Sequence, residues 1–164
     1  MPFELPDNLH PDCAPIAWLL GTWRGNGHGD YPTIEPFQFG QEAIFTHDGR
    51  PFFHYMSRAW IVDDKGNKVR DAAIETGFLR PKADGTLEVV LTHNTGFIEI
   101  WYGHAEGAKI EITTDAVGRT ETAKEVTAGH RLYGLVEGDL LWTYDMAAVG
   151  QKLQPHLWGR LVRQ

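Results

Sequence analysis

Apolar and polar side chains alternate along most of the chain with a period of two residues. In one such segment Leu87, Val89 and Leu91 lie at every second position, and in another Glu111 lies between Ile110 and Ile112. Side chains two residues apart lie on the same side of a β-strand. The alternation therefore predicts strands that turn one face toward a core.

About ten such segments follow one another, with turn signals every 8–12 residues or so, among them two Asp-Gly pairs that are typical of hairpins. The expected strands cover residues 21–31, 37–46, 51–62, 69–80, 87–92, 97–102, 110–112, 126–136, 140–146 and 153–162. Short links favour antiparallel pairing of neighbours, and closure of the meander removes its edges. The pattern predicts an all-β fold, a closed antiparallel up-and-down barrel like those of lipocalins and fatty-acid-binding proteins. We expect one short N-terminal helix before it, over Ala14–Leu20, with Asp12 as its cap and Gly21 at its end.

The first expected strand has glycine at almost every position of one face. That face consists of Gly21, Trp23, Gly25, Gly27, Gly29 and Tyr31, whereas the other face is wholly polar. A strand that lacks side chains on one side bends sharply or lets another group approach its backbone. The glycines could therefore form a barrel corner or make room for a flat ligand, and the stretch alone supports both interpretations.

Composition narrows the class of protein. A length of 164 residues fits one domain, residues 1–164, and the single Cys13 excludes an internal disulfide. The first residues lack the basic and apolar regions of a signal peptide, and no apolar run approaches the roughly 20 residues that cross a bilayer. We therefore expect a cytoplasmic protein without a membrane partner. The net charge of −7 argues against a nucleic-acid partner, and six tryptophans with eight phenylalanines indicate an aromatic core or pocket lining.

Eight histidines are the main candidates for chemistry, but none has the spacing of a zinc motif. His156 differs in context, because it lies between Pro155 and Leu157 in the last strand, and Pro155 indicates an edge or a bulge. A lone histidine in an apolar strand is more often a hydrogen-bonded core residue than a ligand. His54 and His93 could contact a ligand from the side opposite to His156, although a turn or surface position fits each of them better.

Two stretches taken together resemble the nitrobindin family. The first is GTWRGNGHGDYPTIEPF, with the GxWxGxG motif of Gly21, Trp23, Gly25 and Gly27, followed by Tyr31-Pro32-Thr33. The second is the terminal MAAVGQxLxxHL segment that contains His156. Lipocalins also begin with G-x-W, so the combination carries the resemblance, which extends from about Pro15 to Arg163.

The resemblance implies a barrel that holds one haem b per chain, usually with ferric iron. It implies nitric oxide and peroxynitrite as small ligands, and isomerisation of peroxynitrite to nitrate as the activity. His156 stands where the family has its axial iron ligand, and would be the metal-binding and catalytic residue. Thr33 stands where the family has a haem-contacting threonine. Lys124 is a weaker candidate for the haem propionates, and a solvated lysine explains it slightly better.

The residues themselves indicate only which side chains could surround such a haem. Trp23 and Tyr31 could wall the disc, although Trp23 fits a core position as well. The resemblance leaves the choice between a monomer and a homodimer open.

Two other functions fit the same pattern of strands. A carrier of a small apolar molecule would be colourless and would keep His156 as a core residue. A structural or interaction module would have a filled barrel without a ligand. Fold analogy does not choose among these three functions, because function resides in the site.

Overall fold

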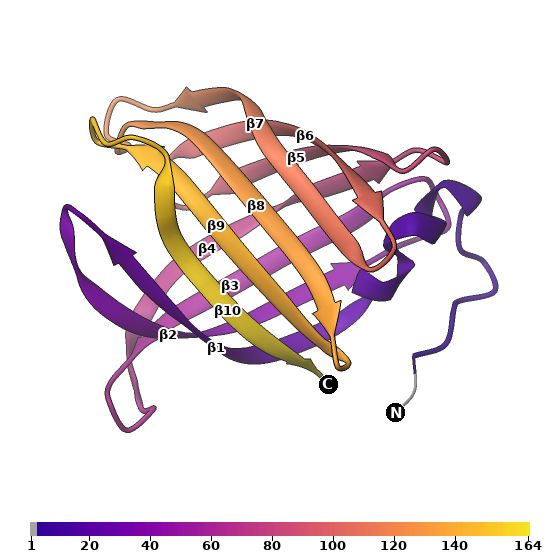
Figure 1. Ribbon diagram of the computed structural model, residues 1–164, viewed down its shortest axis with the longest axis horizontal. Helices are drawn as coiled ribbons and strands as arrows, with labels where there is room; N and C mark the ends of the chain where they lie inside the picture. Colours follow the sequence, from indigo (N-terminus) through magenta and orange to yellow (C-terminus); the bar gives the residue numbers. More distant parts are fainter. Residues whose placement is uncertain (1–2) are drawn as a thin grey trace.

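The computed structural model describes residues 3–164 and contains one 3-10 helix and ten strands within them (Figure 1). The elements are η1 (Pro11–Leu19), β1 (Gly21–Tyr31), β2 (Ile34–Thr46), β3 (Phe53–Val62), β4 (Lys68–Pro81), β5 (Thr86–His93), β6 (Phe97–Glu106), β7 (Lys109–Arg119), β8 (Val126–Val136), β9 (Asp139–Ala148) and β10 (Gln154–Arg163). Each strand pairs antiparallel with its sequence neighbours, and β1 also pairs with β10. The predicted all-β, closed, up-and-down barrel is confirmed.

The helix differs from the predicted one in type and in start. It is a 3-10 helix that begins at Pro11, and its N-cap is His10 rather than Asp12. The Nδ1 atom of His10 accepts the backbone N–H of Asp12 at 3.1 Å. Pro15, inside the helix, lacks the N–H group that a regular α-helix would donate to the carbonyl of Pro11. The helix lies at one end of the barrel (Figure 1), and within residues 3–164 no helix has the length and apolar character needed to span a membrane.

Several strands are longer than the apolar alternation predicted, and the sixth and seventh exceed their predicted lengths the most. The sixth was expected over residues 97–102 and the seventh over 110–112, yet β6 and β7 pair from Phe97 and Arg119 to Glu106 and Lys109. Most of the additional positions hold polar or small residues, many of them exposed. Backbone hydrogen bonding therefore extends these strands beyond the part that the core requires.

The alternation of β1 is as predicted, and the structure shows what its glycines do. An added Cβ would lie 2.1 Å from the Arg160 carbonyl oxygen at Gly25, 2.3 Å from the Phe39 ring at Gly27 and 2.1 Å from the Phe37 ring at Gly29. Such distances leave no room for a side chain. The glycines thus let β10 approach and close the barrel, and rings from β2 cover the inner face of β1.

The GxWxGxG motif is part of this closure. Trp23 is fully buried in the core, and its Nε1 donates to the Leu19 carbonyl at 2.8 Å. The Arg163 guanidinium, from β10, lies 4.1 Å from the centre of the Trp23 ring and donates to the carbonyls of Leu20 and Trp18. Trp23 therefore joins η1, β1 and β10 and does not wall a ligand site.

The barrel interior has three zones along its axis. The zone nearest η1 is densely packed, with a void of only about 10 Å³ among residues such as Leu19, Phe45 and Leu87. Buried polar residues follow: Gln41, Ser57, Glu99 and Arg131. At the far end a separate apolar cluster contains Tyr31, Val126 and Ala148, with Phe97 and Met146 packed against it. The η1 half therefore leaves no room for a long apolar ligand.

Candidate functional site

His156 lies at a β-bulge near the start of β10. The pairing register with β9 shifts between Pro155 and Leu157, so His156 is the extra residue. Trp158 and Arg160, two and four residues later, are exposed on the outer face. Strict alternation would place His156 on that face as well. The bulge instead turns its side chain inward, a common use of bulges next to functional sites.

Three aromatic rings surround the His156 imidazole. The ring centres of Tyr31, Tyr144 and Phe37 lie 5.2, 5.8 and 6.5 Å from that of His156, all in edge-on arrangements. The Tyr31 hydroxyl also accepts the backbone N–H of Ala148 at 3.0 Å, which ties β1 to the end of β9. The predicted role of Tyr31 as a wall of the site agrees with this geometry.

A second bulge holds the imidazole in place. The register of β1 with β2 shifts around Asp30, whose carbonyl oxygen lies 3.1 Å from Nδ1 of His156. A carbonyl can only accept, so Nδ1 carries the proton and Nε2 keeps a free lone pair. Burial lowers the pKa of His156, and the positive charges of Arg131 and Lys124 lower it further. The site thus holds a neutral imidazole with one nitrogen available to a metal.

Thr33 and Lys124 lie at the rim of the same end. Thr33 is exposed in the turn between β1 and β2, directly beyond Tyr31. Lys124 is exposed in the loop between β7 and β8, directly before Val126 of the far apolar cluster. These loops lie at the end opposite η1 in Figure 1. The structure therefore places both residues at the end of the barrel that contains His156, as solvent-facing groups.

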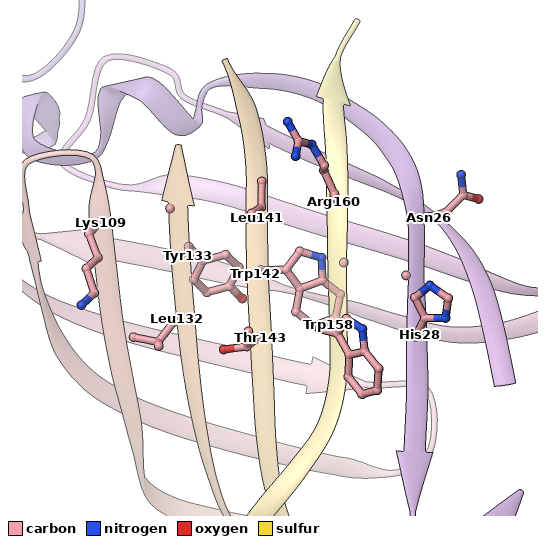
Figure 2. Close-up of a pocket in the computed structure, with 13 residues that line it drawn as sticks. Asn26, His28, Lys109, Leu132, Tyr133, Leu141, Trp142, Thr143, Trp158 and Arg160 are labelled. Atoms are coloured by element: carbon pink, nitrogen blue, oxygen red, sulfur yellow. The ribbon is translucent and has the colours of Figure 1, made fainter. Parts of the chain in front are cut away.

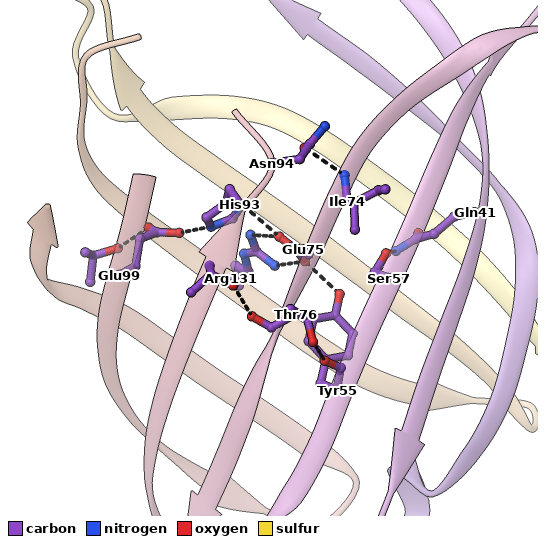
Figure 3. Close-up of polar contacts among 12 residues, drawn as sticks. Gln41, Tyr55, Ser57, Ile74, Glu75, Thr76, His93, Asn94, Glu99 and Arg131 are labelled. Atoms are coloured by element: carbon purple, nitrogen blue, oxygen red, sulfur yellow. Dashed lines mark hydrogen bonds and ion pairs between the residues drawn. The ribbon is translucent and has the colours of Figure 1, made fainter. Parts of the chain in front are cut away.

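A network of buried charges lies deeper in the barrel (Figure 3). Arg131 donates two hydrogen bonds to Glu75, at 2.7 and 2.9 Å, and the Tyr55 hydroxyl donates a third at 2.6 Å. His93 lies between two carboxylates, with Nδ1 3.4 Å from Glu75 and Nε2 2.6 Å from Glu99. Burial alone would raise the pKa of Glu75, but the Arg131 charge and hydrogen bonds outweigh it and lower that pKa to about 2.

His54 and His93 were the candidates for binding a ligand from the side opposite to His156, and the structure places them differently. His54 lies on the outer face, 3.0 Å from the Thr76 hydroxyl, as expected of a surface residue. His93 contradicts the expectation of a turn or surface position, because its side chain is only 8% exposed and stacks on Phe97 at 3.8 Å. The sequence contained a signal for the buried position of His93. Glu99 lies two residues before Trp101 and so on the same inward face of the strand, where a carboxylate needs a buried partner.

The groups at this end fit a haem. Among residues 3–164 no three His, Cys, Asp or Glu side chains come together as a group that could hold a metal ion. A haem needs only one such donor from the protein, with apolar walls and groups for its carboxylates. His156 supplies a neutral nitrogen, the aromatic rings and the far apolar cluster supply walls, and Lys124 supplies a positive charge at the rim.

A concavity elsewhere on the barrel is separate from this site. It encloses about 520 Å³ on the outer face of β8, β9, β10 and β1 (Figure 2). Trp158 and His28 stack along it, with their ring centres 5.8 Å apart. His156 is not among the residues that line it.

Comparison with known proteins agrees with the fold and with haem binding by the family. The family model described as "THAP4-like, heme-binding beta-barrel domain" matches residues 12–163. A protein from Nocardioides sp. named peroxynitrite isomerase is 74% identical over 164 residues, which is 100% of both chains. A ferric nitrobindin-like protein from Cutibacterium acnes is 46% identical over 99% of each chain. The crystal structure of Rv2717c from M. tuberculosis has a TM-score of 0.85 at 39% identity, covering 95% of this chain and 99% of that one.

Proposed function

Because the chain belongs to the THAP4-like, haem-binding β-barrel family, we propose that it binds one haem b, takes up nitric oxide and isomerises peroxynitrite to nitrate. The observation that carries this proposal is the inward-facing His156, whose Nδ1 is held by the Asp30 carbonyl and whose Nε2 is left for iron. The name of the Nocardioides relative supports the reaction.

His156 would bind the haem iron and would be the residue on which activity depends. Two bulges orient its ring, and a hydrogen bond to a backbone carbonyl fixes the tautomer and increases the basicity of the ligating nitrogen. Burial keeps the imidazole neutral, as iron ligation requires. When bound, the haem supplies an open coordination position at which a small ligand reacts.

The remaining residues at this end position the reactants and exclude water. Tyr31, Phe37 and Tyr144 close the barrel around His156. Peroxynitrite and nitrate contain the same atoms and the same charge, so the reaction needs no reductant, oxidant or second substrate. The reaction breaks the O–O bond of peroxynitrite and forms a new N–O bond from the same atoms. The protein would therefore have to keep the two fragments together until they recombine, and apolar walls favour this.

Thr33 and Lys124 hold the haem propionates at the rim. A carboxylate at this position would accept a hydrogen bond from the Thr33 hydroxyl and pair with the Lys124 ammonium group. Both side chains face solvent, so each contact contributes modestly. Their role is to orient the haem, whereas its retention depends on His156 and the apolar walls.

The alternative of an apolar-ligand carrier has less support. Lipocalin-like carriers keep a cavity inside the barrel, whereas the η1 half of this barrel is filled by core side chains around a void of about 10 Å³. The polar residues in the middle of the barrel would also face such a ligand.

Absorption spectroscopy with and without added hemin tests the proposal. We expect a sharp Soret band and rapid peroxynitrite decay to nitrate in the wild type. His156→Ala should lose most haem and the isomerase activity, whereas His104→Ala, a change to an exposed histidine of β6, should retain both. Full haem loading and an unchanged rate in His156→Ala would show that another residue binds the iron. A wild type that takes up no hemin would refute the haem function itself.

A further inference from the structure

Three buried polar atoms inside the barrel have no partner among residues 3–164. They are Nε1 of Trp101, Nε of Arg131 and the hydroxyl of Tyr144. The three residues are 0, 3 and 5% exposed. Buried polar groups are almost always hydrogen-bonded, so an unpaired one indicates a missing partner. Each of these atoms carries a hydrogen that it can donate.

The three residues form one cluster next to His156. The Arg131 guanidinium carbon lies 4.5 Å from the centre of the Tyr144 ring and 5.1 Å from that of Trp101. The Trp101 and Tyr144 rings are 6.3 Å apart. Tyr144 also contacts His156, with ring centres 5.8 Å apart. The unpaired donors therefore lie in the interior directly adjoining the proposed haem site.

Neighbouring residues keep the cluster in place. Arg131 and Tyr144 are direct partners in the pairing of β8 with β9. A Cβ on Gly129 would come within 2.7 Å of the Trp101 ring and 2.9 Å of the Tyr144 ring. The two other guanidinium nitrogens of Arg131 bind Glu75. Glu75 thus fixes the orientation of Arg131 and leaves Nε as its spare donor.

The chemistry of the donors favours an anion over water. A buried water molecule typically makes about three hydrogen bonds and accepts at most two of them. This cluster offers three donors, and only the Tyr144 oxygen among them can also accept. A small oxyanion has acceptor lone pairs for all three and needs no donor partner. Arg131 is paired with Glu75 through its two terminal nitrogens, but its Nε–H still belongs to a cation, and hydrogen bonds from a charged donor to an anion are stronger than those to a neutral acceptor.

We propose that Arg131, Tyr144 and Trp101 form a subsite for a small planar oxyanion, with nitrate as the representative ligand. The assignment to catalysis rests on the proposed function, in which peroxynitrite is the substrate and nitrate the product. The three residues are then positioning residues that hold the anion beside the reacting centre. The subsite itself exists whether or not the reaction takes place there.

Calorimetric titration with nitrate tests the subsite without measuring activity. We expect saturable nitrate binding to the purified protein in its haem-loaded form. A titration with sodium chloride at the same ionic strength is the control for non-specific effects of salt. Tyr144→Phe removes one donor and should weaken nitrate binding roughly three- to tenfold, as loss of one hydrogen bond predicts. Trp101→Phe should have a similar effect. Tyr102→Phe, which removes a hydroxyl from the exposed outer face of β6, should leave the affinity unchanged.

The outcomes separate this proposal from the proposed function. Absence of saturable nitrate binding, or equal affinity in Tyr144→Phe and the wild type, would overturn the subsite even if haem loading and isomerase activity were normal. Nitrate binding that weakens in both variants would support the subsite, and would do so even if the protein took up no haem. A melting curve of each variant shows that the fold is retained.

Discussion

Replacement of Glu75 by Gln tests the buried charge network, because it removes one charge and little volume. Glu75 is paired with Arg131 through two hydrogen bonds of 2.7 and 2.9 Å, and their side chains are 15 and 4% exposed. The variant leaves the Arg131 cation buried without its main partner. Removal of one member of a buried ion pair typically costs about 3–5 kcal/mol.

The pKa of Glu75 supports the same magnitude. It falls from an ordinary value of 4.5 to about 2, with the cost of burial outweighed by Arg131. At about 1.4 kcal/mol per pH unit, this difference corresponds to about 3 kcal/mol. Because the pKa is lower in the folded chain, the contribution is complete above about pH 4.5 and is lost as the pH falls toward about 2. Wild type and Glu75→Gln should therefore differ most at neutral pH and converge in acid.

Urea unfolding followed by tryptophan fluorescence measures this difference at about pH 7, 4 and 3. Both proteins are compared in the same haem-loading state, because a bound ligand adds stability. Glu106→Gln, at an exposed position of β6, is the matched control and should change stability by less than about 0.5 kcal/mol. A difference below about 1 kcal/mol at neutral pH, or one that stays constant into acid, would refute the reasoning.

Two further predictions concern packing. Burial raises the pKa of the Cys13 thiol to about 11. A disulfide reagent at about pH 8 should therefore label Cys13 only after unfolding, and rapid labelling of the native protein would show that the surroundings of Cys13 open. Gly27→Ala would place a Cβ 2.3 Å from the Phe39 ring and 2.5 Å from the Trp158 carbonyl oxygen. It should lower the free energy of unfolding by about 1–3 kcal/mol, whereas Gly134→Ala, with its nearest atom 3.8 Å away, should change it little; equal effects would contradict the packing argument.

Local pattern was sufficient for much of the fold. The period of two, the Asp-Gly turns and the absence of long links predicted a closed antiparallel meander, because side-chain alternation and turn chemistry act over a few residues. The predicted alternation along Gly21–Tyr31 is the one observed. The error in the helix also has a local cause, since Pro15 removes a hydrogen-bond donor from the helix interior and so disfavours the α-helix that was expected.

The positions of the site residues depend on contacts between distant parts of the chain. His156 and the Asp30 carbonyl are 126 residues apart, and their contact lies beside two register shifts, one between β10 and β9 and one between β1 and β2. A bulge reverses which face a residue occupies, and neither bulge follows from local alternation. The sequence singled out His156 by its flanking Pro155 and by family resemblance, but not the direction in which its side chain points.

The sequence by itself determined the period of the strands, the turns between them and the glycine face of β1, since these depend on properties of each residue and its near neighbours. Only the tertiary structure decided that Phe37 and Phe39 cover those glycines. It alone also brought Arg131 to Glu75, 56 residues away, and His93 between two carboxylates. The reason is that a buried charge is stable only beside a partner, and in a barrel the partner is set by closure and register rather than by distance along the chain.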